Sequence, residues 1–172
     1  MDLTISQALR KIAKLKGALK EHLERAEASI NFTEAEPPAF EFADSMGNAD
    51  KVRAELITLE SSLRHTNALT TFSHGGVTMT LSEATCRLQE HKSRIAWLQR
   101  LPSMPQESTS RDHIEYRYIE GRGQVAGNVP KITRCALPQA KRAALVATEQ
   151  EQFDSLNDAV ENLNHRTSLL QG

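Results

Sequence analysis

The sequence predicts a mainly α protein, an antiparallel coiled-coil helical bundle of three to four long helices that carries a small β-ribbon and assembles as a homo-oligomer. The first observation is a stripe of apolar residues at alternating steps of three and four, which is the spacing of a coiled-coil seam. Its members are Leu56, Leu59, Leu63, Leu81, Ala84, Leu88, Ile95, Leu98, Phe153, Leu156, Val160, Leu163 and Leu170. The second is a hydrophobic content of 39% with only 5% aromatic residues, which is ordinary for helices that pack through Leu, Ile and Ala. Because such narrow stripes leave little apolar area inside one subunit, we expect self-association.

Length and composition narrow the class of protein further. A chain of 172 residues fits one domain, so we expect 1–172 to form a single helical domain. The two cysteines lie far apart without a C-x-x-C spacing, which argues against a disulfide scaffold. Residues 1–7 lack the features of a secretory signal, and the longest apolar run, 143–147, is far shorter than the roughly 20 residues that span a bilayer. We therefore expect a cytoplasmic protein without a membrane partner.

The first predicted helix covers 4–30. Thr4 and Gln7 form a capping box, and apolar residues recur at helical spacing up to Ile30. Basic residues gather near the start of this helix and acidic residues near its end, the unfavourable polarity for the helix dipole. An antiparallel neighbour with complementary charges or a bound polyanion would offset it, and we favour the neighbour.

An acidic and aromatic loop is predicted over 31–48. Pro37-Pro38 and Gly47 interrupt the helical pattern, and five acidic residues occur between 31 and 50 without a basic one. The segment also holds four large apolar residues, which we expect to pad the end of the bundle, with docking of a partner as the alternative: Phe32, Phe40, Phe42 and Met46. A second helix follows over 49–69.

The third helix is predicted over 80–101. Ser73-His74-Gly75-Gly76 indicates a very short hairpin before it. Thr80 and Glu83 form a second capping box at its start, and Pro102 stops it. His91 falls on the seam of this helix, where we expect a core polar residue that fixes register.

A β-ribbon is predicted over 114–136. The residues from Ile114 to Ile119 alternate as a strand does, and after a Gly-rich stretch 131–136 returns as the second strand. Pro138 suits a first helical turn, so the last helix is predicted over 138–170.

With this order of elements, the chain resembles the septicolysin-like family of uncharacterised bacterial helical proteins. The resemblance is carried by Leu63-Arg64-His65-Thr66-Asn67, by Thr80-Leu81-Ser82-Glu83-Ala84, and by the strand that feeds a long final helix. It implies a helical bundle that self-associates and has no established enzymatic activity. The name suggests a pore-forming toxin, which the missing membrane segment does not support. The chain departs from the family's usual short connector by carrying a longer insertion over 121–130.

A candidate ligand site lies in segment 111–142, which holds seven basic and three acidic residues. Arginine binds phosphate and carboxylate through two hydrogen bonds, and tyrosine offers a face on which a base stacks. The six predicted site residues are Tyr116, Arg117, Tyr118, Arg122, Lys131 and Arg134. We expect a non-enzymatic protein that captures a small anionic, nucleotide-like ligand at subunit contacts, by analogy with phage proteins that absorb immune nucleotide signals. Two alternatives stay open: the acidic segment of the same or a neighbouring subunit pairs with the ribbon and nothing else binds, or the oligomer is a structural adaptor for a protein partner.

No catalytic, cofactor or metal signature is present in the sequence. Residues 121–126 match G-x-G-x-x-A, but Gly127-Asn128-Val129-Pro130 forbids the helix that must follow a dinucleotide fingerprint. The six histidines form no E-x-x-H pair of a di-iron bundle, and no zinc spacing, P-loop or G-x-S-x-G occurs. The sequence thus predicts no enzyme, no cofactor and no metal, and a net charge of -1 argues against nucleic acid as a partner.

Overall fold

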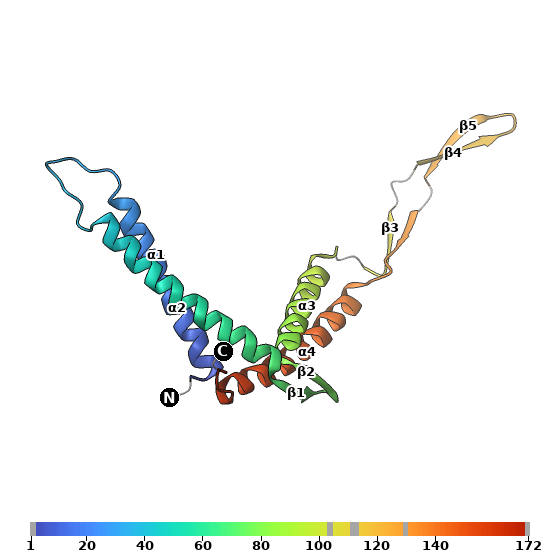
Figure 1. Cartoon of the computed structure of the whole chain (residues 1–172). Coiled ribbons are helices and arrows are strands. Elements are labelled where there is room, and N and C mark those ends of the chain that lie inside the picture. The colour runs from blue at the N-terminus through green and yellow to red at the C-terminus, as the bar shows by residue number, and fades with distance from the viewer. Residues whose placement is uncertain (1–2, 103–104, 111–113, 129–130, 171–172) are drawn as a thin grey trace. The chain divides into compact units, whose positions relative to one another are not determined.

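The computed structural model describes residues 3–102, 105–110, 114–128 and 131–170 of a mainly helical chain with small antiparallel sheets (Figure 1). The elements in chain order are α1 (Ile5–Ala28), α2 (Phe42–Leu69), β1 (Thr71–His74), β2 (Val77–Thr80), α3 (Leu81–Arg100), β3 (Glu107–Ser110), β4 (Ile114–Ile119), β5 (Gly123–Asn128), β6 (Lys131–Arg134) and α4 (Gln139–Arg166). The chain divides into two compact units. Unit 1 comprises Met1–Leu88 with Ser155–Gly172, and unit 2 comprises Gln89–Asp154.

In unit 1, α1 begins at the predicted capping box. The Gln7 backbone N–H donates to Thr4 Oγ1 at 3.3 Å, and the Thr4 N–H donates to Gln7 Oε1 at 3.0 Å. The helix packs along α2 through a seam in which small residues are fully buried, among them Ala8 and Ala49. Small side chains let the two helices approach closely over this stretch.

Ion pairs between α1 and α2 offset the unfavourable charge polarity of α1. Lys11 Nζ lies 2.6 Å from Glu55 Oε1, and Lys16 Nζ lies 2.9 Å from Glu60 Oε1. The hydrogen bond from Lys16 lowers the pKa of Glu60. These contacts confirm the prediction of an antiparallel neighbour with complementary charges.

The predicted loop over 31–48 is too long, because α2 begins at Phe42 rather than at residue 49. Gly47 lies inside the helix, although glycine costs about 1 kcal/mol there relative to alanine. Ser45 is buried one turn before Ala49, so the seam against α1 extends through this turn and its packing outweighs the propensity of Gly47.

Of the four large apolar residues predicted to pad the end of the bundle, Met46 is partly buried, whereas the three phenylalanines between the end of α1 and the first residue of α2 stay exposed. Phe32, Phe40 and Phe42 are 61%, 48% and 49% exposed. The Arg25 guanidinium lies 4.5 Å from the centroid of the Phe40 ring, a cation–π contact. The connection therefore presents aromatic surface to solvent.

The core of unit 1 gathers residues from four parts of the chain. Its buried members are Ile5, Met79, Leu81, Ala84, Leu156 and Val160, with Leu63, Phe72, Leu88 and Leu163 packed against them. The β1–β2 hairpin brings Met79 into this core, and Gly75 and Gly76 form its two-residue loop with φ of 56° and 78°. Positive φ at both positions is what a type I′ turn requires, so the Gly-Gly pair sets the predicted hairpin.

The two ends of the chain pair with each other in unit 1. The Ile5 N–H donates to the Thr167 carbonyl at 2.9 Å, and the Leu169 N–H donates to the Leu3 carbonyl at 2.8 Å. The Leu170 N–H donates to Thr66 Oγ1 at 2.9 Å, and the side chain of Thr66 is fully buried. Because residues 167–170 form these hydrogen bonds instead of continuing the helix, α4 ends at Arg166 and not at residue 170 as predicted.

The capping box at the start of α3 is confirmed. The Thr80 N–H donates to Glu83 Oε2 at 2.7 Å, and the Glu83 N–H donates to Thr80 Oγ1 at 3.1 Å. The backbone hydrogen bond from Thr80 lowers the pKa of the Glu83 carboxyl, with the Thr80 hydroxyl adding to the effect.

Glu83→Gln is expected to flatten the acid dependence of stability. Because the pKa of Glu83 is lower in the folded chain than its ordinary value, its contribution is present above that value and is lost as pH falls through the folded pKa. Melting temperatures of the parent and of Glu83→Gln, measured from pH 6 to pH 3, should therefore converge at the acid end. Glu90→Gln, on an exposed position of the same helix, is the control and should keep the parental slope. A parental slope for Glu83→Gln would contradict the role of its charge.

Unit 2 carries a longer ribbon than predicted, with a different strand pairing. β4 pairs with β5 from Ile119↔Gly123 to Ile114↔Asn128. β3 pairs with β6 from Glu107↔Arg134 to Ser110↔Lys131. The Arg122 N–H donates to the Ile119 carbonyl at 3.0 Å across a turn in which Gly121 has a φ of 85°. That φ suits position i+2 of a type II turn, so the chain reverses there and the Gly-rich stretch becomes a strand.

Candidate functional site

The tip of the ribbon carries two exposed tyrosines on one face. Tyr116 pairs with Ala126 and Tyr118 pairs with Gln124 across β4 and β5. Positions two apart in a strand share a face, and cross-strand partners share it too. Tyr116 and Tyr118 are 66% and 78% exposed, so this face presents most of the surface of both residues to solvent.

Arg117 lies on the opposite face from the tyrosines, because neighbouring positions of a strand alternate. Its cross-strand partner is Val125, and Ile119, 47% exposed, shares its face. The structure therefore does not bring the Arg117 guanidinium onto the tyrosine face of its own ribbon.

Arg122 stands in the turn at the tip of the ribbon and is exposed. Gly121 and Gly123 flank it, and both have positive φ. The turn joins β4 to β5, so Arg122 is a neighbour in the chain of the strands that carry Tyr118 and its partner Gln124.

The remaining two predicted site residues belong to the other strand pair. Arg134 lies opposite Glu107, and its Nε is 3.7 Å from Glu107 Oε2, with 81% of the arginine side chain exposed. Lys131 stands opposite Ser110 at the far end of β6, and its side chain is outside the described part of the structure. The six residues are thus divided between two strand pairs and two faces.

Unit 2 contains a buried ionic cluster, and the sequence analysis did not identify its central residue, Glu149. Glu149 on α4 is only 7% exposed. The His91 Nδ1–H donates to Glu149 Oε2 at 2.9 Å, and the Arg94 Nε lies 3.1 Å from Glu149 Oε1 in an ion pair. This contact satisfies His91 as the sequence predicted. The sequence does indicate a seam position for Glu149, because Val146, Glu149 and Phe153 follow the same three-and-four spacing as the seam.

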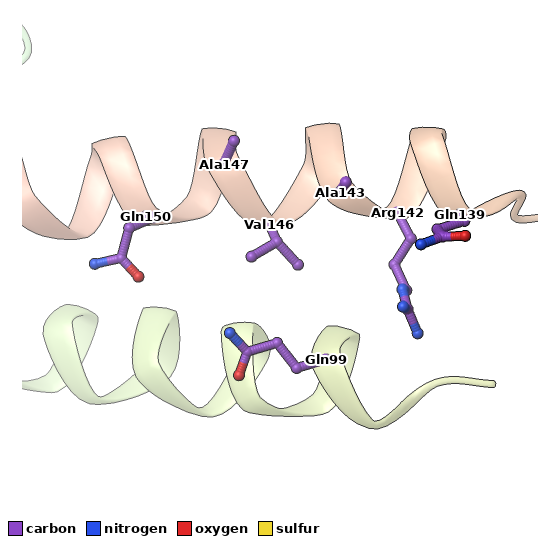
Figure 2. Close-up of a pocket in the computed structure, with 7 residues that line it drawn as sticks. All are labelled: Gln99, Gln139, Arg142, Ala143, Val146, Ala147 and Gln150. Atoms are coloured by element: carbon purple, nitrogen blue, oxygen red, sulfur yellow. The ribbon is translucent and has the colours of Figure 1, made fainter. Parts of the chain in front are cut away.

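Unit 2 also holds a pocket of about 400 Å³ along the first turns of α4. Figure 2 shows Gln99 of α3 facing Val146 of α4, with Arg142 near one end. The lining residues are Gln99, Gln139, Arg142, Ala143, Val146, Ala147 and Gln150. The Arg142 guanidinium donates to the Leu101 carbonyl, so part of its hydrogen-bonding capacity is already used. The described residues that line this pocket are amides, apolar side chains and one arginine, and none of these groups transfers a proton near neutral pH.

Within the residues that the structure describes, no group of three or more His, Cys, Asp or Glu side chains is placed to hold a metal ion. Cys86 and Cys135 are free thiols. No described helix has the length and apolar character needed to cross a bilayer.

The chain was compared with family models, with curated proteins and with solved structures, and none of them matches it. The resemblance to the septicolysin-like family therefore stays a prediction that depends on the residues quoted for it.

Proposed function

We propose that the chain is a non-enzymatic, oligomeric binding protein that captures a small anionic, nucleotide-like ligand at the tip of its ribbon. The observation that carries the proposal is the pair of exposed tyrosines on one face, Tyr116 and Tyr118. Side chains two positions apart in a strand stand about 7 Å from each other, a separation that admits one planar ring between two aromatic faces.

Polar groups suited to the rest of a nucleotide lie beside the tyrosines. Gln124, the cross-strand partner of Tyr118, carries an amide that both donates and accepts hydrogen bonds, as the edge of a base requires. Arg122 in the turn supplies a guanidinium for phosphate. Because Arg117 faces away from the tyrosines, the proposed ligand site does not use its guanidinium.

Self-association is supported by the large number of apolar side chains that one copy of the chain leaves exposed. Among the described residues, the buried apolar set includes only three leucines, Leu81, Leu98 and Leu156. Many large apolar side chains stay exposed, among them Leu9, Leu23, Ile57, Trp97, Leu145, Ile119 and Ile132. Leu56 and Leu59 of the predicted seam are only half buried. Oligomerisation is the usual way in which such surface is covered.

The ligand test is a thermal-shift panel of mono-, di- and cyclic nucleotides, preceded by mass spectrometry of small molecules released from the purified protein. A ligand at 100 times its Kd should raise the melting temperature by roughly 5 °C or more for a chain of this size. Tyr118→Ala and Arg122→Ala should abolish the shift. Arg64→Ala removes a comparably exposed arginine from α2 and should retain it.

No shift with any nucleotide, together with no released small molecule, would contradict the proposal. A shift that survives both Tyr118→Ala and Arg122→Ala would show that a ligand binds elsewhere, and would remove the ribbon as its site.

A second candidate function is that of an adaptor for a protein partner, favoured by the exposed aromatic side chains of the α1–α2 connection. Phe32, Phe40 and Phe42 lie close in sequence and are all about half exposed or more, which is uncommon on a surface without a partner. A pull-down whose bound protein is lost with Phe40→Ser, and retained with Ile57→Ser, would support it.

A further inference from the structure

We propose that β4 pairs edge to edge with β4 of a second copy, in an antiparallel register centred on Tyr116. The two ribbons would then form one four-stranded sheet in the order β5, β4, partner β4, partner β5. This inference concerns assembly and does not depend on the ligand, so it can fail or hold separately from the proposed function.

The first argument is the free edge of β4. In the described part of the chain β4 pairs with β5 alone, so every second residue of its other edge presents an unpaired N–H and C=O. A two-stranded ribbon is marginally stable by itself in water, whereas sheets of three or more strands are stable. An added strand would satisfy the backbone groups and stabilise the ribbon.

The second argument is the composition of the two edges. β4 reads Ile-Glu-Tyr-Arg-Tyr-Ile, in which four of six residues are aromatic or β-branched. β5 reads Gly-Gln-Val-Ala-Gly-Asn, which contains two glycines and one residue with high strand propensity. Strand addition is therefore expected at the β4 edge and not at the β5 edge.

The third argument is charge complementarity, which selects both the partner and the register. When two copies of β4 run antiparallel about Tyr116, position 115 of each copy lies opposite position 117 of the other, so the sequence places an acidic residue opposite a basic residue twice. Centring the pairing on residue 117 would place Arg117 opposite itself, and centring it on residue 115 would place Glu115 opposite itself. The strand is thus complementary to a second copy of itself, as a two-fold interface requires.

The pairing also has a consequence for the exposed aromatic side chains. Because positions 116 and 118 share one face, the four-stranded sheet would carry four tyrosines on that face, two from each copy. Ile119 would lie on the other face, next to Arg117.

Charge reversal tests the pairing through the oligomeric state, measured by sedimentation over a dilution series without ligand. Glu115→Arg and Arg117→Glu each turn two attractive pairs into two repulsive ones, so each variant alone should associate roughly 10- to 100-fold more weakly than the parent. An equimolar mixture of the two variants restores attraction at both pairs and should recover the parental association. Arg64→Glu, a charge reversal on α2, is the control and should associate like the parent.

Disulfide trapping tests the register directly, in a Cys86→Ser, Cys135→Ser background. Tyr116→Cys lies on the two-fold axis, opposite itself at a Cα separation of about 4.5–5.5 Å, within the range that a disulfide spans. It should cross-link to dimer under mild oxidation. Ile119→Cys is also at an exposed position but would lie about 20 Å from its counterpart in this register, so it should stay uncross-linked. Parental association of both single charge variants, no recovery in their mixture, or equal cross-linking at the two cysteine positions would each overturn the proposal.

Discussion

Leu81→Ala is expected to lower the free energy of unfolding by about 4–5 kcal/mol, since truncation of a buried leucine costs roughly 2.7–5 kcal/mol and costs most where the cavity stays open. The Leu81 side chain is 1% exposed and belongs to the core cluster of unit 1. Its contacts come from the β1–β2 hairpin and from both ends of the chain, through residues such as Met79, Ile5 and Leu156. Neighbours anchored in separate segments cannot close the cavity together, so the loss is expected in the upper part of the range for leucine.

Urea unfolding followed by circular dichroism measures this change. Leu69→Ala is the matched control, because the Leu69 side chain is 58% exposed at the end of α2, and its truncation should cost less than about 1 kcal/mol. Equal losses for the two substitutions would contradict the assignment of Leu81 to the core.

A double-mutant cycle on His91 and Glu149 is expected to give a coupling free energy of about 2 kcal/mol. His91→Leu leaves a carboxylate that is 7% exposed with the ion pair to Arg94 alone, and should cost about 2–3 kcal/mol. Glu149→Leu leaves the imidazole without its acceptor and should cost less. The double variant joins two apolar side chains across the α3–α4 seam and should lie within about 1 kcal/mol of the parent.

The same urea titrations supply the four free energies of the cycle, and His165→Leu, at an exposed position of α4, is the control for replacing a histidine. Additive losses in the double variant would show that His91 and Glu149 are not coupled. A second measurement concerns the register of α3 against α4. A polar pair at one level of a seam disfavours a shift of one helix along the other. The α3 amides near His91 should therefore exchange their hydrogens at more varied and faster rates in the double variant, even where its stability is recovered.

Local signals predicted much of the fold. Both capping boxes and the Gly75-Gly76 turn depend on residues within a few positions of each other, and the structure places them where the sequence did. The seams were predicted because a period of three and four persists over many turns. The start of α2 could not be predicted in the same way, since the effect of Gly47 on the helix is decided by packing against α1 and not by its own neighbours.

The ribbon and the candidate site show where pattern reasoning stopped short. The pairing of β4 was assigned to the wrong strand because the Gly-rich stretch after Gly121 has low strand propensity, and only the turn geometry determines the register. By contrast, the separation of Arg117 from Tyr116 follows from the two-residue period of any strand, so a six-residue site on one face was never available to a single ribbon. Glu149 could have been found, because a carboxylate at a seam position requires a partner at the same level.

Unit 1 closes only after unit 2 has been made, because Leu156 and Val160 follow the whole of Gln89–Asp154 in the chain. On the ribosome, the early helices and the β1–β2 hairpin must therefore wait with one side of their core uncovered until the last segment leaves the exit tunnel. Long-range closure of this kind slows folding and exposes apolar surface to other nascent chains. The synthesis of this protein is thus expected to depend on chaperone capture, and a pause or truncation upstream of Ser155 should yield aggregates rather than a smaller folded product.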